Sequence, residues 1–97
     1  MKSLLFRPAA AADLDEAWLW YEKQRSGLGD EFLAEAETAI QRILATPLAY
    51  AVVYKDRRRG LLHRFPYSVV YRIVEEQIVI LAIVHAKRSP RVWRQRP

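Results

Sequence analysis

The stretch IVILAIVH, residues 78–85, is the most apolar part of this chain of 97 residues. Seven apolar residues follow one another from Ile78 to Val84 without the alternation of a half-buried strand. This pattern predicts a strand buried on both faces at the centre of a sheet. The run is far too short to cross a membrane as a helix, which takes about 20 residues. The rest of the chain must therefore supply the neighbouring strands and the layers that cover them.

Four further stretches are expected to form strands, because they are rich in β-branched and aromatic residues. They span residues 3–7, 50–54, 60–65 and 68–74. Glu75-Glu76-Gln77 predicts a tight turn that joins the last of these strands to the central one as a hairpin. Arg57-Arg58-Arg59-Gly60 is expected to form a basic turn. Pro66 separates the predicted strands 60–65 and 68–74, which favours one bent strand or two strands with a bulge.

Two helices are predicted between the first strand and the second. Pro8 suits the first position of a helix, and an apolar stripe at helical spacing follows from Leu14 to Tyr21. The acidic residues 13, 15 and 16 are expected in or near its first turns, where the positive end of the helix dipole stabilises them. Gly27 is expected to cap this helix, and a second helix is predicted over residues 30–45. The acidic side chains of both helices are expected to face water.

The order β-α-α-β-β-β predicts an α+β fold in a single domain, residues 1–97. The short connection makes the two helices an antiparallel hairpin, which we expect to cover one face of an antiparallel sheet. The other face is expected to be partly open beside the basic residues, where it forms a binding surface.

Charge is divided unevenly along the chain. Residues 1–54 carry five Lys or Arg against eight Asp or Glu, a net charge of −3, whereas residues 55–97 carry eleven against three, a net charge of +8. Such a positive field favours encounters with nucleic acid, an anionic membrane or an acidic protein segment. The alternative is a solvated basic surface without a special partner.

Several classes of protein are excluded or disfavoured by composition. The chain has no cysteine, which excludes disulfides and thiolate metal sites and favours a reducing, cytoplasmic location. Its three glycines form neither a phosphate-binding loop nor a dinucleotide fingerprint. His63 and His85 lie on different predicted strands without clustered carboxylates, so we expect no metal and no cofactor. No stretch predicts a signal peptide or a membrane span, so we expect a soluble protein.

Short motifs run along nearly the whole chain. They are Asp13–Glu16 with Trp20–Glu22, Gly27–Gly29 with Phe32–Leu33, Ala39–Ile40 before Pro47, Arg58–Arg59, Arg64–Tyr67, Val70–Ile73, and His85–Pro90 with Trp93. In this order and spacing they resemble the RelE/ParE superfamily of bacterial toxin–antitoxin toxins, and most closely its ParE branch.

This resemblance implies a toxin that is neutralised by a cognate, ParD-like antitoxin, with DNA contacted only through the antitoxin and no membrane partner. Members of the ParE branch inhibit DNA gyrase by binding it, whereas RelE-like members cleave mRNA on the ribosome. The acidic, amphipathic segment of the antitoxin is expected to fold on the toxin as it binds. We expect it to contact a surface that includes Trp20, Arg64, Tyr71 and Arg72.

The two branches make different demands on the basic half of the chain. The gyrase-binding surface is expected to use seven residues: Arg57, Arg58, Arg59, Lys87, Arg88, Arg91 and Trp93. The alternative, a ribosome-dependent endoribonuclease, would use Arg64, Arg72, His85 and Arg88. Ser68 stands where the nuclease branch typically has an arginine, and Trp93 where it tends to have a tyrosine. These departures favour a binding inhibitor with no catalytic residue.

Two aromatic side chains allow a structural interpretation as well. His85 is either a proton-transfer group or a hydrogen-bonded residue at the end of a strand. Trp93 either stacks on a target or anchors the end of the chain to the sheet.

Overall fold

A computed structural model describes residues 3–97 and has an α+β fold, as the sequence predicts. The elements follow the expected order with one short addition at the end. They are β1 (Ser3–Phe6), α1 (Pro8–Gln24), α2 (Leu28–Ala45), the 3-10 turn η1 (Pro47–Ala49), β2 (Val52–Tyr54), β3 (Arg57–Leu61), β4 (Tyr67–Val74), β5 (Gln77–His85) and α3 (Arg91–Arg94). Within residues 3–97 no helix is long and apolar enough to cross a membrane.

The five strands form one sheet in the order β1-β5-β4-β3-β2. All residues from Ile78 to Val84 are buried, which confirms the prediction for the most apolar stretch. The expectation of a purely antiparallel sheet needs one correction, because β1 pairs parallel to β5. A strand buried on both faces also needs hydrogen-bond partners along both of its edges. In β5, one edge pairs with β4 and the other pairs with β1.

The basic segment that begins at Arg57 is a strand and not a turn, which corrects the expectation. The turn lies just before it, at Lys55 and Asp56, and Lys55 takes a positive φ of 51°. In β3, Arg58 pairs with Tyr71 and Gly60 with Val69. Leu62 to Pro66 form a loop, so the strand predicted over residues 60–65 is wrong beyond Leu61.

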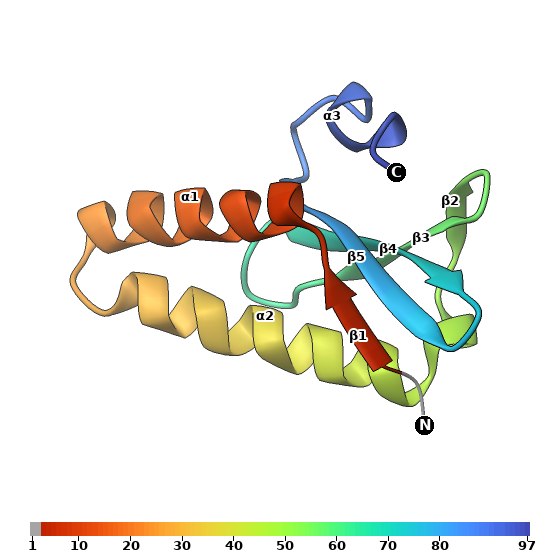
Figure 1. Cartoon of the computed structure of the whole chain (residues 1–97). Coiled ribbons are helices and arrows are strands. Elements are labelled where there is room, and N and C mark those ends of the chain that lie inside the picture. Colours follow the sequence, from red (N-terminus) through yellow and green to blue (C-terminus); the bar gives the residue numbers. More distant parts are fainter. Residues whose placement is uncertain (1–2) are drawn as a thin grey trace.

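The helices pack against one face of the sheet, antiparallel to each other, and their connection lies at the end remote from the strands (Figure 1). Phe32 and Ile43 of α2 are fully buried there, and Tyr21 stacks on Phe32 with ring centroids 5.2 Å apart. Because α1 begins at Pro8, Asp13 is its sixth residue. The acidic residues therefore follow the first turn of the helix and do not lie within it.

The connection between the helices depends on two glycines and one carboxylate. Gly27 adopts a left-handed φ of 90°, and α2 begins at Leu28, two residues earlier than predicted. The Glu22 carboxylate accepts hydrogen bonds from the backbone N–H groups of Gly27 (3.0 Å) and Gly29 (2.8 Å). Glu22 therefore caps the start of α2 instead of facing water, because the first N–H groups of a helix have no partner within it.

The other face of the sheet is less open than expected. Residues 86–97, which we call the tail, fold back over it, and α3 lies on the opposite side of the sheet from α2 (Figure 1). Trp93 is buried there against Val70, Ala82 and Val84. The tail thus covers apolar surface of the sheet that would otherwise be exposed to solvent.

Candidate binding cleft and basic surface

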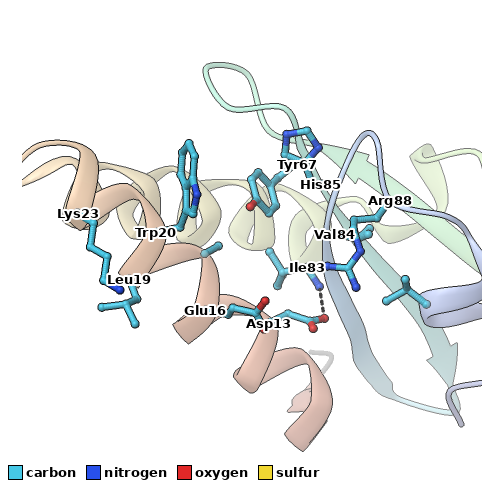
Figure 2. A pocket seen from close by; sticks show the side chains of 12 residues that line it. Asp13, Glu16, Leu19, Trp20, Lys23, Tyr67, Ile83, Val84, His85 and Arg88 are labelled. Carbon is cyan, nitrogen blue, oxygen red and sulfur yellow. Dashed lines mark hydrogen bonds between the residues drawn. The ribbon is translucent and has the colours of Figure 1, made fainter.

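A cleft of about 310 Å³ opens between α1, the end of β5 and the tail. Figure 2 shows Leu19, Trp20 and Lys23 extending from α1, with Tyr67, His85 and Arg88 across the cleft. Asp13 and Ile83 line the same cleft between α1 and β5 (Figure 2). Helix, sheet and tail each supply one wall, so the cleft exists only in the folded chain.

The wall from α1 is apolar and exposed. Trp20 leaves 57% of its surface accessible and Leu19 leaves 49%. Neither side chain belongs to the core, although the Trp20 ring meets Tyr21 edge-on at 5.1 Å. Exposed tryptophan beside exposed leucine is typical of a protein contact surface.

The opposite wall carries hydrogen-bond donors. The His85 ring accepts the backbone N–H of Lys87 at Nδ1 (3.0 Å), so the neutral ring carries its proton on Nε2. The ring packs edge-on against Tyr67, with centroids 5.1 Å apart. Burial, followed by the nearby Tyr21 and Glu16, raises the pKa of Tyr67 above its ordinary value. The Tyr67 hydroxyl is therefore protonated at neutral pH and does not act as a base.

The cleft also contains opposite charges. Glu16 on α1 and Arg88 in the tail are exposed, and within residues 3–97 neither forms an ion pair. The apolar pair Leu19 and Trp20 shares the cleft with them. A complementary segment would present an apolar side chain to Trp20 and a carboxylate to Arg88.

The four residues of the nuclease alternative do not come together. His85 and Arg88 share the cleft, but Arg72 lies opposite Val79 on β5, about 20 Å along the strand from His85. Its guanidinium binds Asp56 at 2.8 and 3.0 Å. Arg64 lies on the outer side of the loop after β3 and pairs with Glu31 at 2.8 Å. Hydrogen bonds from Arg64 and Arg25 lower the pKa of Glu31 below its usual value.

Three residues expected to bind the target serve the fold instead. The Arg57 side chain is only 13% exposed, and it pairs with Asp56 (2.6 Å) and donates to the Arg96 carbonyl (2.9 Å). Arg58 donates to the carbonyl oxygens of Leu48 (3.4 Å) and Tyr50 (2.6 Å). Trp93 is buried between the tail and the sheet, which favours the interpretation of this residue as an anchor.

Two residues expected to bind the antitoxin are also placed differently. Tyr71 is fully buried, and its hydroxyl donates to the Pro47 carbonyl at 2.5 Å. This corrects the expectation, because a buried side chain offers no surface to a partner. Arg72 holds Asp56 and the tail, since its guanidinium also donates to a Pro97 oxygen at 3.1 Å. Trp20 remains exposed in the cleft, and Arg64 remains exposed outside it.

The remaining basic residues of the expected set form an exposed surface on β3 and the tail. Arg59, Lys87, Arg88 and Arg91 are exposed, and the part of the chain that the structure describes gives none of them an acidic partner within 4.0 Å. We call these four residues the basic surface. Three of its four members belong to the tail, so its shape depends on how the tail is held.

The sequence gives no signal for the contact between Asp13 and Arg96. Arg96 pairs with Asp13 although 83 positions separate them. In the sequence, an acidic residue at position 13 is explained by its place near the start of a helix. Only the folded chain brings Asp13 and Arg96 together. Residues 3–97 bring no three His, Asp or Glu side chains together as metal ligands.

Comparison with known proteins gives concordant matches. A family model described as the ParE toxin of the type II toxin–antitoxin system parDE matches residues 4–90. Toxin ParE2 of Mycobacterium tuberculosis, in the strains CDC 1551 / Oshkosh and H37Rv, is 33% identical over 79 residues, covering 80% of this chain and 75% of the relative.

A solved structure has the same fold. The structure titled "Chromosomal ParDE TA system from P. aeruginosa" matches with a TM-score of 0.79 at 24% identity, and the match covers 88% of this chain and 96% of that chain. The helical hairpin and the sheet on which it packs are thus shared with a solved protein.

Proposed function

Because the chain belongs to the family of ParE toxins of type II toxin–antitoxin systems, we propose that it inhibits DNA gyrase by binding it and that a cognate ParD-like antitoxin neutralises it. The observation that carries this proposal is the basic surface. Its four cations are free to meet acidic groups of a target, whereas Arg57, Arg58 and Arg72 are used to hold the fold. Free surface charge raises the rate and the specificity of binding.

Binding rather than catalysis is supported by the cleft. Cleavage of RNA at a 2′-hydroxyl needs a base, an acid and cations that stabilise the phosphate. Of the four residues expected for the nuclease, His85 and Arg88 line the cleft, whereas Arg64 and Arg72 form ion pairs with Glu31 and Asp56 outside it. A binding inhibitor needs none of this chemistry.

We assign the cleft to the antitoxin and the basic surface to the target, with Arg88 shared by both. An amphipathic segment that folds as it binds can place an apolar side chain against Trp20 and Leu19. A carboxylate on the same segment can pair with Arg88, and a cation with Glu16. The acidic character expected of the antitoxin agrees with the net charge of +8 on residues 55–97.

The second candidate function, mRNA cleavage on the ribosome, is favoured by one observation. His85, Tyr67 and Arg88 line one cleft, and within residues 3–97 the His85 Nε2 has no hydrogen-bond partner while Nδ1 accepts the Lys87 N–H. This candidate predicts that His85→Ala abolishes activity, whereas the gyrase proposal predicts that it does not.

The test compares two assays with the same purified protein. Supercoiling by gyrase should be inhibited by the native chain and by His85→Ala, and inhibition should weaken when Arg59 and Arg91 are both replaced by Gln. Primer extension on translating ribosomes should show no discrete cuts. Cuts that disappear in His85→Ala, with supercoiling unaffected by the native chain, would overturn the proposal in favour of the nuclease.

A further inference from the structure

Three of the contacts that hold the tail over the sheet come from different parts of the fold. Trp93 is buried against β4 and β5, and Arg57 of β3 donates to the Arg96 carbonyl at 2.9 Å. The third contact is an ion pair between Arg96 and Asp13 of α1. Among the hydrogen bonds and ion pairs of residues 3–97, this third contact is the one that joins the tail to α1.

Asp13 binds two different segments at once. Arg96 Nη1 donates to Asp13 Oδ2 at 2.6 Å and Nη2 donates to Oδ1 at 3.3 Å, so the pair is bidentate. The backbone N–H of Ile83 donates to the same Oδ2 at 3.1 Å. The Asp13 and Arg96 side chains are 19% and 22% exposed, and an ion pair with so little exposure is weakly screened.

An irregularity in β5 supplies the remaining partner of Arg96. Val70 pairs with Ala82 and Tyr71 with Ile80, so Leu81 has no opposite residue on β4. Its carbonyl oxygen accepts a hydrogen bond from Arg96 Nη1 at 3.0 Å. A bulge thus turns a backbone acceptor out of the ladder and toward the tail, as bulges commonly do near binding sites.

The ion pair lies where the walls of the cleft meet. Asp13 and Ile83 line the cleft, and the hydrogen bond between them is the dashed line in Figure 2. Arg88 and Val92 of the tail form part of the opposite wall. The contact of Asp13 with Arg96 therefore joins the wall of α1 to the tail beside the cleft.

We propose that Asp13 and Arg96 are positioning residues that hold the tail as a rigid wall of the cleft, so that seating of the tail and binding of a segment in the cleft are coupled. Coupling is reciprocal. A segment that binds in the cleft and touches the tail stabilises the tail in its place over the sheet, and a loosened tail weakens the binding of that segment. The identity of the occupant as the antitoxin rests on the proposed function. The seating of the tail does not.

The first experiment measures opening of the tail without any partner. Trypsin under native conditions should cut after Arg91 and Arg94 only when the tail lifts, and mass spectrometry gives the rate at these sites. Arg96→Gln and Asp13→Asn should each raise this rate about tenfold or more, because each breaks hydrogen bonds to a charged group. Asn keeps an acceptor for the Ile83 amide, so the change reports the ion pair.

Two further variants make this experiment decisive. Arg96→Lys keeps the charge and should restore part of the protection. Arg25→Gln removes the exposed pair with Glu31 at the far end of the hairpin and should leave the rate at Arg91 and Arg94 unchanged. Native rates in both Arg96→Gln and Asp13→Asn would overturn the proposal, and so would acceleration by Arg25→Gln equal to theirs.

The second experiment measures coupling with the co-expressed antitoxin. Saturating antitoxin should slow cleavage at Arg91 and Arg94 of the native chain, and Arg96→Gln should bind the antitoxin about tenfold more weakly than the native chain. Faster cleavage in Arg96→Gln with native antitoxin affinity would overturn the coupling. A failure of gyrase inhibition changes neither readout, so the two proposals fail separately.

Discussion

Trp20 is an exposed residue whose loss should affect binding and not folding. Truncation of a tryptophan at the centre of an interface commonly costs at least about 2 kcal/mol of binding free energy, which corresponds to roughly 30-fold in Kd. We expect Trp20→Ala to weaken antitoxin binding by this amount in calorimetry while thermal unfolding changes little. Leu48→Ala is the control, because Leu48 is 71% exposed and lies outside the cleft. Equal losses in the two variants would contradict the assignment of the cleft.

The free energy of unfolding should depend on pH in the alkaline range because of Tyr71. Burial raises the pKa of this tyrosine from its ordinary value of 10.0 to about 12. A raised pKa means that the neutral form is favoured by folding, so the stabilisation is complete below pH 10 and is lost as the pH rises toward 12. The free energy of unfolding should fall by roughly 2–3 kcal/mol across that window.

The control for this titration is Tyr71→Phe, followed by urea unfolding at several pH values. This variant should show a smaller fall between pH 10 and 12, because Tyr21 and Tyr67, whose pKa values are also raised, still titrate. At neutral pH it should lose about 1 kcal/mol with the hydrogen bond to Pro47. An identical pH dependence in both proteins would contradict the role of Tyr71.

Among the elements, the connection between α1 and α2 leaves no room for a larger residue at position 29. A Cβ on Gly29 would lie 2.8 Å from Glu22 Oε1 and from the Trp18 ring. Both neighbours are held, Glu22 by two backbone N–H groups and Trp18 by a hydrogen bond to Asp30 at 3.0 Å. We expect Gly29→Ala to lower the free energy of unfolding by about 1–3 kcal/mol, through strain and a displaced cap.

Chemical denaturation checks this prediction against the exposed neighbour Ser26. Ser26→Ala should change stability by less than about 0.5 kcal/mol, as is usual for surface substitutions. A Gly29→Ala protein as stable as Ser26→Ala would show that the connection adapts to the extra methyl group.

The elements also show where sequence patterns succeed and where they fail. The run Ile78–Val84 and the helical stripe of α2 are predictable, because burial repeats along them with the period of the element. The segment Arg57–Gly60 is predicted as a turn but is a strand. Arginines lie on both of its faces, so apolar and polar residues do not alternate along it. Its pairing with β4 overrides the local preference of the chain.

The cleft was less predictable than the fold for a related reason. Trp20 is detectable as an aromatic residue off the core stripe of its helix. Asp13 and Arg57 both contact Arg96, which is 83 and 39 positions away from them. No local sequence pattern predicts contacts at such separations. Arginines that hold the tail are indistinguishable in the sequence from arginines that face solvent.

At the scale of the whole molecule, the basic surface belongs to a half-chain with a net charge of +8. Steering by such a field is screened over about 8 Å at physiological ionic strength. We expect the association rate constant with the antitoxin to fall about tenfold or more between low salt and half-molar salt, with a smaller change in the dissociation rate. Stopped-flow mixing at a series of salt concentrations measures both.

Two exposed cations provide the variant for this measurement. Arg59→Gln with Arg91→Gln should reduce the slope of the association rate against salt, because it lowers the net charge without touching the cleft. The paired control Arg25→Gln with Arg42→Gln removes the same charge from residues 1–54 and should change the slope less. A flat association rate for the native chain would exclude electrostatic steering.

The parallel pairing of β1 with β5 has a consequence for how this protein is made. Ser3 lies opposite Gln77, so β1 pairs with a strand that begins 74 residues later in the chain. Contacts so distant in the sequence form slowly, because a long loop must close first. During synthesis, Leu5 and Phe6 emerge from the ribosome long before Val79 and Ile80 do, and the cleft has no second wall until the tail is translated. A nascent chain that lacks residues 77–97 therefore has neither the partner strand of β1 nor the tail wall of the cleft.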